Sequence, residues 1–493
     1  MDTSFKSNQP FIYQEKTRTI IFVCNGEIYN FKELIEEFEL SISGNSDCKT
    51  IPELYRVLGY DGFCSLFDSE IKGEFAFCMF EFDIHKNLRK IIAGRDQVGI
   101  RPLYYHNPTK SSELIMFSSE IKGMTSFEDK IEEFPPGKIV KFEIDEFGKL
   151  ERDEFDFVNY IPDDFIEDTS EKSIINSIRT SVINAVRRRL DADRPLAFLL
   201  SGGIDSSIVC AVAQKILKVP IKTYCCGMKE GTDILFARKV AEFIGSSHTE
   251  VFFTPEEGLT SIDEVIYATE TWDTTTIRAS VGQFMVCKYI GQKTDAKVVL
   301  VGEGPDEVCS SYMFNWYAPT GKALSDTAKK YVKEIHMYDG RRADRCISYW
   351  GLEGRVPLLD PEFIHQYWEI PDKMRHPKYK GIEKYYLRKA FEDILPKEVV
   401  WRTKEAFSDG VSSKEKSWYE IIQDHILEKI GDKDWTSYPS PEAFYYAEKF
   451  NEFFPNKKNV LPHYWQPKWK EDGTEVSKYI DPSARVLDVY NKK

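Results

Sequence analysis

The stretch FLLSGGIDSSIVC, residues 198–210, constrains the fold of this chain more than any other feature, because glycine, serine and aspartate interrupt an apolar run there. The apolar residues before the interruption predict a buried strand, and Ile208, Val212 and Ile216 recur at helical spacing after it. In a parallel sheet, a loop that joins a strand end to a helix start lies where such folds bind ligands. The stretch therefore predicts a ligand-binding loop in an α/β domain.

The side chains of this loop suit a phosphate group. A helix N-terminus has unpaired N–H groups that favour anions. Gly202 and Gly203 would let the backbone approach a phosphate closely, and the hydroxyls of Ser201 and Ser206 can donate hydrogen bonds to it. Asp205 would repel a bare phosphate, so its presence indicates a Mg²⁺ ion between the two. A plain Gly/Ser turn with a capping aspartate is the alternative, and the full SGGxDSS pattern disfavours it.

Length and composition narrow the class of protein. A chain of 493 residues predicts two or three domains, and a formal net charge of −14 argues against a general binder of nucleic acids or anionic membranes. The polar first ten residues and the lack of any apolar run of about 18 residues predict neither a signal peptide nor a membrane span. The ten cysteines form no CxxC pair and the eight histidines do not cluster with them, which predicts reduced thiols, no structural zinc and a cytoplasmic location.

The periodicity of apolar residues changes near residue 171. Before it, strands are predicted at 18–31, 74–82, 90–93 and 114–117, with a helix at FKELIEEF. After it, helical patterns such as EKSIINSIRTSVINAVRRRL and DILFARKVAEFIG alternate with the apolar runs PLAFLL, IKTYCCGM and AKVVL. Strands that alternate with helices predict a parallel sheet covered by helices on both faces.

SGGxDSS is the pyrophosphate loop of the ATP-pyrophosphatase superfamily, and within that superfamily the chain resembles glutamine-dependent asparagine synthetases. The resemblance runs in collinear order over nearly the whole sequence. It rests on CNGEIYNF (24–31), GRDQVGIRPLYY (94–105), FPPGK (134–138), TWDTTTIRAS (271–280), GEGPDEV (302–308), HMYDGRRADRCISYWGLEGRVPLLD (336–360), WRTKEAFSDGV (401–411) and DPSAR (481–485).

The resemblance implies that the second half of the chain makes β-aspartyl-AMP from aspartate and ATP, releases pyrophosphate, and lets ammonia displace AMP. ATP and Mg²⁺ are then required, with Asp205 and Asp306 as the metal ligands. The catalytic residues implied are Glu303, Arg278 and Lys404. The residues implied to bind ATP or pyrophosphate are Leu199, Ser201, Gly202, Gly203, Asp205, Ser206, Cys226, Val301 and Gly302. The chain departs from the family at Val301, where serine is usual, so a hydroxyl contact to the nucleotide is lost, and at Pro305, which also replaces a usual serine.

For the first half, the resemblance implies a glutaminase domain of the N-terminal-nucleophile (Ntn) hydrolase type, an αββα fold, whose mature chain begins with a cysteine. In this sequence residue 2 is Asp2 and the first cysteine is Cys24, which is expected to pack within a strand rather than act as a nucleophile. The domain is therefore expected to be incomplete, and the printed chain to use ammonia rather than glutamine. The implied glutamine-binding residues are Asn25, Gly26, Glu27 and Asp47.

The predicted organisation is a glutamine amidotransferase-like domain at 1–155, a linker at 156–170, a synthetase domain at 171–460 and a tail at 461–493. Two alternatives stay open: a β-lactam synthetase, which shares this architecture but closes a ring by intramolecular amide formation, and a catalytically dead relative that acts as a scaffold. The motifs at 336–360 and 401–411 favour asparagine synthetase. The expected partners are small molecules, namely aspartate, ATP and glutamine or ammonia, and neither a nucleic acid nor a membrane. A homodimer is compatible with the resemblance, but the sequence leaves the oligomeric state open.

Overall fold

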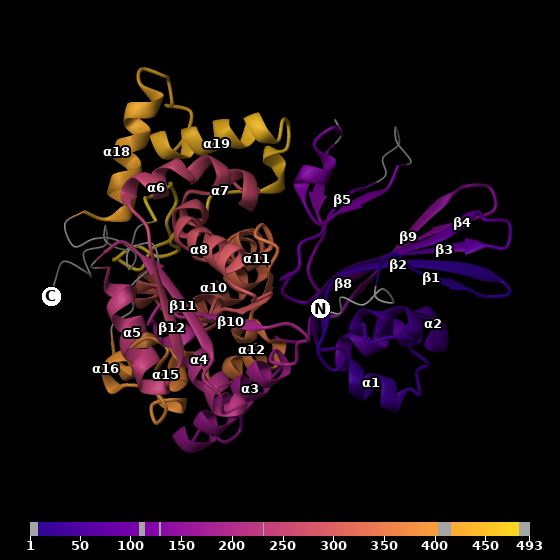
Figure 1. Ribbon diagram of the computed structural model, residues 1–493, viewed down its shortest axis with the longest axis horizontal. Coiled ribbons are helices and arrows are strands. Elements are labelled where there is room, and N and C mark those ends of the chain that lie inside the picture. Colours follow the sequence, from indigo (N-terminus) through magenta and orange to yellow (C-terminus); the bar gives the residue numbers. More distant parts are fainter. Residues whose placement is uncertain (1–7, 108–113, 128–129, 230, 403–415, 483–493) are drawn as a thin grey trace. The chain divides into compact units, whose positions relative to one another are not determined.

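A computed structural model describes residues 8–107, 114–127, 130–229, 231–402 and 416–482 (Figure 1). The chain forms two compact units, residues 1–161 with 191–193 and residues 162–190 with 194–493. Each unit has its own main sheet. No helix among the described residues is long and apolar enough to cross a membrane.

The first unit is built on a six-stranded antiparallel sheet. Its strands, in spatial order, are β1 (Phe11–Gln14), β2 (Arg18–Ile28), β3 (Gly73–Asp83), β4 (Leu88–Arg95), β8 (Lys138–Ile144) and β9 (Leu150–Asp156). The strands predicted near 18–31, 74–82 and 90–93 are the three central ones, β2, β3 and β4. The predicted strand at 18–31 is shorter in the structure, because β2 ends at Ile28.

Both faces of this sheet are covered. Helices α1 (Phe31–Glu37) and α2 (Thr50–Ser69) pack on one face, where Phe63 and Phe67 of α2 contact Phe77 of β3. A small sheet of β5 (Tyr104–His106), β6 (Met116–Ser118) and β7 (Glu132–Glu133) packs against the other face. The described residues thus form one helical layer and two sheets, and they contain no second helical layer of an αββα arrangement.

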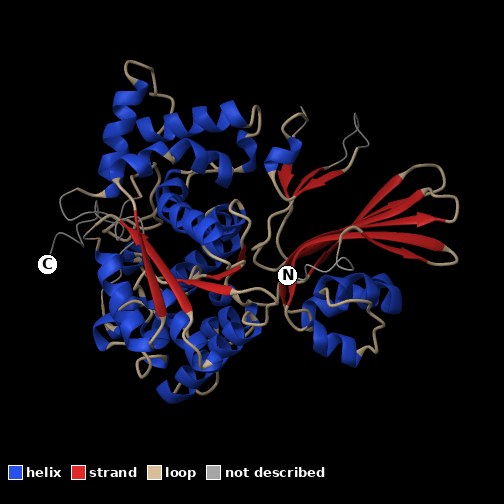
Figure 2. Cartoon of the chain, viewed as in Figure 1, coloured by secondary structure: helices blue, strands red, loops and turns tan. Residues whose placement is uncertain are grey.

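The second unit contains the predicted parallel sheet, with helices around it (Figure 2). Its spatial order is β12 (Ser247–Phe252), β11 (Lys222–Gly227), β10 (Leu196–Leu199), β13 (Val298–Leu300) and β14 (Glu353–Arg355). The chain runs outward from β10 to β12 and then returns to β13 on the other side of β10. The carboxyl ends of β10 and β13 therefore meet at a topological switch point, where open α/β sheets bind ligands.

The helices of this unit follow from its sequence pattern and its caps. Helix α3 (Glu171–Arg188) begins after Ser170, whose side chain accepts a hydrogen bond from Ser173 N, and α5 (Thr232–Ile244) ends at Gly245 in a left-handed conformation. The other helices are α4 (Ile204–Leu217), α6 (Pro255–Thr260), α7 (Ile262–Thr269), α8 (Thr274–Lys293), α9 (Pro305–Val308), α10 (Gly321–Glu334), α11 (Asp339–Ser348), α12 (Pro361–Trp368), α13 (Asp372–Arg375), α14 (Pro377–Lys380), α15 (Tyr385–Ala390), α16 (Lys397–Val400), α18 (Trp418–Ile430) and α19 (Pro441–Phe453).

Candidate active site

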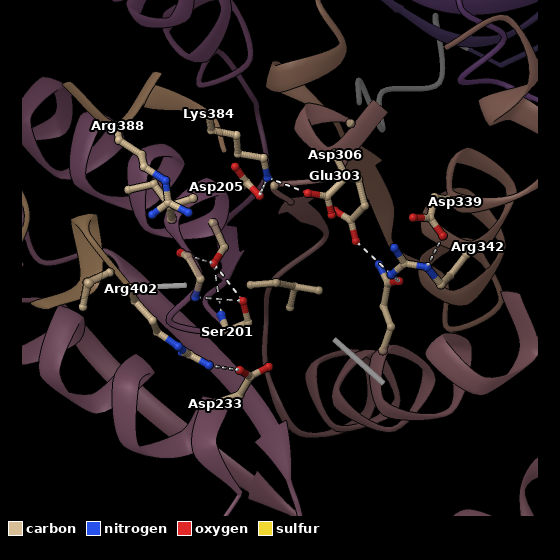
Figure 3. Close-up of a pocket in the computed structure, with 18 residues that line it drawn as sticks. Ser201, Asp205, Asp233, Glu303, Asp306, Asp339, Arg342, Lys384, Arg388 and Arg402 are labelled. Carbon is tan, nitrogen blue, oxygen red and sulfur yellow. Dashed lines mark hydrogen bonds and ion pairs between the residues drawn. The ribbon is translucent and has the colours of Figure 1, made fainter. Parts of the chain in front are cut away.

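A pocket lies at the switch point of the parallel sheet (Figure 3). Its walls come from the loop between β10 and α4, the loop between β13 and α9, the first turn of α11, and the segment 384–402. Segments far apart in the sequence thus converge on the two loops that contain the SGGIDSS and GEGPDEV motifs.

Two glycines let these loops pack closely. Gly202 has a φ of +77°, and a Cβ there would lie 2.4 Å from Ala237 N of α5. A Cβ on Gly302 would lie 2.6 Å from Ser206 N, so no larger residue fits between the end of β13 and the start of α4. At Gly203, by contrast, a Cβ would lie 3.4 Å from Ser201 Oγ, an ordinary contact distance. The first two glycines therefore serve the packing of the pocket floor, while the backbone at Gly203 is open to a ligand.

The hydroxyl groups of the first loop hold its shape. Ser206 Oγ accepts a hydrogen bond from Ser201 N at 3.2 Å and lies 3.1 Å from Ser201 Oγ. Ser201 Oγ in turn accepts from Gly203 N at 3.3 Å. These contacts gather two hydroxyls at the N-terminus of α4, a helix of 14 residues.

Lys384 joins the two carboxylates that the sequence suggests as metal ligands. Its Nζ lies 2.5 Å from Asp205 Oδ2 and 2.6 Å from Asp306 Oδ1, and its side chain is 2% exposed. Burial alone would lower the pKa of Lys384, but the two carboxylates outweigh it and raise that pKa, so the ammonium stays charged. The sequence does not predict this residue. One indirect sign of a cation was available in the sequence: the carboxylates of Asp205 and Asp306, which need a nearby positive charge when the fold brings them together.

A second charged group lies on another side of the pocket (Figure 3). Arg342 Nη1 donates to Glu303 Oε1 at 3.1 Å and to Gln283 Oε1 at 2.6 Å, and Arg342 Nε donates to Asp339 Oδ1 at 3.2 Å. Burial raises the pKa of Glu303, and Arg342 opposes that rise. The sequence predicts Glu303 as a site residue but not its three neighbours.

Two further arginines line the pocket. The Arg402 guanidinium lies 4.0 Å from the centre of the Phe236 ring, and its Nη2 is 3.8 Å from Asp233 Oδ1. Arg388 is fixed by hydrogen bonds of 2.5 Å to Glu383 Oε1 and to the Val400 carbonyl. With Lys384 and Arg342, these side chains give the pocket four cations to offset its carboxylates.

Most of the predicted nucleotide-site residues lie in or beside this pocket. Its lining includes Leu199, Ser201, Gly203, Asp205, Ser206, Gly302, Glu303 and Asp306. Gly202 belongs to the same loop but packs on α5. Cys226 and Val301 are buried and absent from the lining. The Cys226 thiol donates to the Gly282 carbonyl at 2.9 Å, and Val301 N donates to the Arg355 carbonyl at 3.1 Å.

The two predicted catalytic cations are placed differently from the pocket cations. Arg278 of α8 is 3% exposed and pairs with Glu442 of α19 at 2.5 Å and with Asp481 at 2.9 Å, rather than lining the pocket. Lys404 lies outside the described residues. Their catalytic roles stay predictions.

The predicted glutamine-binding residues gather in the first unit. Asn25, Gly26 and Glu27 follow one another on β2, and Asp47 Oδ2 accepts a hydrogen bond from Ile28 N at 2.6 Å. A Cβ on Gly26 would lie 2.1 Å from the Glu74 carbonyl of the paired strand β3, so this position requires glycine. Burial raises the pKa of Asp47, and its hydrogen bond from Ile28 N opposes the rise.

Cys24 is part of the sheet, as predicted. The side-chain amide of Gln9 accepts from Cys24 N at 2.6 Å and donates to the Cys24 carbonyl at 2.7 Å, and the Cys24 side chain packs against the core below α2. Its thiol neighbours that of Cys48, and this neighbour together with burial raises the pKa of Cys48 far above its usual value. The protonated Cys48 thiol, which donates to the Gly26 carbonyl at 3.3 Å, is a poor nucleophile.

Glu307 gives the pocket region a pH-dependent stability. Burial, with Asp339 and Asp306 nearby, raises the pKa of Glu307 to about 8, and Tyr312 Oη donates to its Oε1 at 2.5 Å. Because the folded pKa exceeds the unfolded one, the folded state binds the extra proton. The stabilisation from this proton is complete at pH values below the ordinary pKa of glutamate, and it is lost as the pH rises through about 8.

Replacing Glu307 with its neutral isostere should remove this dependence. Glu307→Gln is expected to raise Tm relative to wild type at pH 9 and to leave it nearly unchanged at pH 5, measured by thermal unfolding with a chelator present. An equal Tm difference at both pH values would contradict the assignment of the proton to Glu307.

Comparisons with known proteins agree with the geometry of both units. The family model "Asparagine synthase" matches residues 177–329 and 318–478, and the family model "Glutamine amidotransferase domain" matches residues 1–126. The chain is 39% identical over 504 aligned residues to the glutamine-hydrolyzing asparagine synthetase of Gallus gallus, covering 95% of this chain and 87% of that protein. It is 36% identical to the Homo sapiens enzyme with the same coverage. The chain therefore belongs to the glutamine-hydrolysing asparagine synthetase family.

Proposed function

We propose that this protein makes asparagine from aspartate by ATP-dependent amidation, through a β-aspartyl-AMP intermediate and with release of AMP and pyrophosphate. The observation that carries the proposal is the pocket at the switch point, where the SGGIDSS loop, Lys384 and the Glu303–Arg342 group face one cavity. Family membership and this arrangement support the same reaction.

The loop after β10 is the proposed pyrophosphate site. The N-terminus of α4, the open backbone at Gly203 and the hydroxyls of Ser201 and Ser206 all favour phosphate oxygens. Lys384, held charged beside Asp205, adds a cation to the same place. These groups would stabilise pyrophosphate as a leaving group.

The carboxylates of Asp205 and Asp306 suit a Mg²⁺ ion. Mg²⁺ is usually bound through one or two carboxylates together with substrate phosphates, and the Lys384 contacts show that these two carboxylates face the same point. When bound, the ion would neutralise phosphate charge during nucleotidyl transfer. Lys384 would then share the two carboxylates with the ion.

The proposed adenylation forms one bond and breaks another. An oxygen of the aspartate β-carboxylate attacks the α-phosphorus, and the bond from that phosphorus to the bridging oxygen of pyrophosphate breaks. Negative charge gathers on the phosphoryl oxygens, and fixed cations lower the barrier because they need no reorganisation. Among the described residues that line the pocket, Lys384 and Arg402 are the cations that would stabilise this charge. The roles of Lys404 and Arg278 stay predictions. Ammonia then attacks the acyl carbon, and AMP leaves with the bridging oxygen.

The nitrogen donor is a separate proposal. Asn25, Gly26 and Glu27 follow one another on β2, and Asp47 is bonded to the backbone of the same strand at Ile28, which supports a glutamine site in the first unit. That this chain takes its nitrogen directly from ammonia stays a prediction. Glutamate release from glutamine, compared with asparagine formation from ammonium chloride, measures it.

Exchange of labelled pyrophosphate into ATP tests the proposed reaction. We expect the exchange to require aspartate, because the intermediate forms reversibly before nitrogen is needed. Exchange that depends on a different carboxylate substrate would favour a β-lactam-synthetase-like ligase. Complete absence of exchange with folded protein would favour a scaffold role.

A further inference from the structure

The C-terminal segment, residues 461–482, is bonded to the start of α8 through the side chain of Asp273. This carboxylate caps the helix and is 0% exposed. Its Oδ2 accepts hydrogen bonds from the backbone N–H and the hydroxyl of Thr276, both at 2.8 Å. Its Oδ1 accepts from Trp465 N at 2.7 Å. One buried carboxylate therefore uses one oxygen for the helix and the other for the C-terminal segment.

The side chain of Trp465 contacts a second wall of the pocket. Its ring centre lies 5.1 Å from that of Tyr312. Tyr312 Oη donates to Glu307 Oε1 at 2.5 Å, and Glu307 belongs to the GEGPDEV segment, residues 302–308, which also brings Glu303 and Asp306 to the pocket. Trp465 thus connects to α8 through its backbone and to the GEGPDEV segment through its ring.

The same two walls also meet inside the pocket (Figure 3). Gln283 of α8 accepts from Arg342 Nη1 at 2.6 Å, and Arg342 Nη1 donates to Glu303 Oε1 at 3.1 Å. Gln283 Nε2 bonds to no described residue, so the link to this wall depends on Oε1. Gln283 follows Asp273 by ten residues, roughly 15 Å along a helix. Two joints this far apart fix both the distance and the angle between the walls.

The rest of the C-terminal segment is anchored on both sides of Trp465. Toward its end, Asp481 accepts from Arg278 Nη1 at 2.9 Å and from Arg278 Nη2 at 3.0 Å, so the segment is also tied to the second turn of α8. Three further hydrogen bonds join Tyr338 Oη to the His463 carbonyl, Tyr331 Oη to the Gln466 carbonyl, and Thr274 Oγ1 to Tyr479 Oη.

From these contacts we infer that Asp273 and Trp465 are positioning residues for the reaction, which hold α8 and the GEGPDEV segment in a fixed relative position by way of the C-terminal segment. Neither side chain lines the pocket. Both act through the groups that do, because a misplacement of about 1 Å at reacting groups lowers a rate by roughly 10²-fold. The inference rests on the proposed adenylation in this pocket.

Two variants break the joint from its two sides. Asp273→Asn has a single acceptor oxygen, so it cannot accept from both Thr276 and Trp465. Trp465→Leu removes the ring beside Tyr312. Each should lower the kcat of aspartate-dependent pyrophosphate exchange by roughly tenfold to hundredfold and leave the KM for ATP within about twofold of wild type. Trp465→Phe keeps an aromatic ring and should recover most of the kcat.

Asp472→Asn is the matched control. Asp472 lies on the same segment and is exposed, and its Oδ1 accepts from Thr474 N at 2.9 Å and from Thr474 Oγ1 at 2.6 Å, the same two donor types that Thr276 offers. It should leave kcat unchanged. All rates are measured well below the Tm of every variant. If Asp273→Asn and Trp465→Leu lower Tm but keep the wild-type kcat, these contacts serve only the fold and the inference is overturned.

Hydrogen exchange in the unmodified protein tests the inference without a variant that has to fold. ATP with Mg²⁺ should slow amide exchange in the pocket loops and, by roughly fivefold or more, in a peptide that covers residues 461–470, because coupling between two sites is reciprocal. Protection of residues 199–206 and 302–308 without any change at 461–470 would overturn the inference and leave the nucleotide site intact. No protection of either loop would instead overturn the proposed function.

Discussion

Asp205→Asn is expected to lower aspartate-dependent pyrophosphate exchange by roughly 10²–10³-fold or more while the protein stays folded. The asparagine keeps the shape of the side chain but loses the charge that would bind Mg²⁺ and that now pairs with Lys384 at 2.5 Å. It would leave a buried ammonium with one carboxylate, Asp306, in place of two. The variant should therefore bind the metal more weakly and hold the Lys384 side chain less firmly in its position.

Asp295→Asn is the matched control for this variant. Asp295 also pairs with a lysine, Lys222 at 2.8 Å, but both side chains are exposed and neither lines the pocket. Exposed pairs contribute little, so exchange should be unchanged. Near-wild-type exchange in Asp205→Asn, measured at saturating Mg²⁺ and ATP, would remove this carboxylate from the reaction.

Arg278→Met is expected to destabilise the second unit by roughly 3–5 kcal/mol, because it leaves the buried Glu442 carboxylate without its cation. The Arg278 side chain is 4% exposed and that of Glu442 is 1% exposed, so solvent screens this pair little. Asp481 loses its contact with the same guanidinium. The expected readout is a lower Tm for the transition that reports on this unit.

The variant Arg278→Met/Glu442→Gln separates a structural role from a catalytic one. Removing the buried charge of Glu442 should recover part of the lost stability. If exchange activity recovers with it, Arg278 acts through folding. If Arg278→Met instead keeps the wild-type Tm and loses kcat, the arginine serves the reaction, as the sequence resemblance implies, and the ion cluster is not its main role.

The parallel sheet and its loop were predictable because their signals are local. An apolar run, a glycine-rich turn and a helical pattern stand next to each other at 196–217, and each constrains the backbone on its own. The order of the strands required the structure, because the return of the chain from β12 to β13 leaves no mark in the sequence.

The partners of the predicted residues could not be read from the sequence. Lys384 is 179 residues from Asp205, and Arg342 is 39 residues from Glu303. Nothing in the segment EKYYLRK distinguishes Lys384 from a surface lysine. Gln283 lies on a helix whose pattern predicts only burial, and its unpaired nitrogen is visible only once Arg342 is in place.

Motif matches name residues without giving their surroundings. Arg278 lies in a matching motif, yet the structure pairs it with Glu442 and Asp481 rather than placing it in the pocket lining. Cys226 and Val301 are buried and do not line the pocket. A motif therefore indicates which reaction to expect, and the contacts of each side chain in the structure indicate whether it acts in that reaction or stabilises the fold.

Oxygen-isotope transfer tests the central claim most directly. Aspartate labelled with ¹⁸O in its β-carboxylate is incubated with ATP, Mg²⁺ and ammonium chloride, and the products are analysed by mass spectrometry. A β-aspartyl-AMP intermediate predicts one ¹⁸O atom in the phosphate of AMP and none in pyrophosphate, because the attacking oxygen stays on the α-phosphorus when ammonia displaces AMP. Formation of ADP with ¹⁸O in inorganic phosphate, or of unlabelled AMP alongside asparagine, would contradict the account.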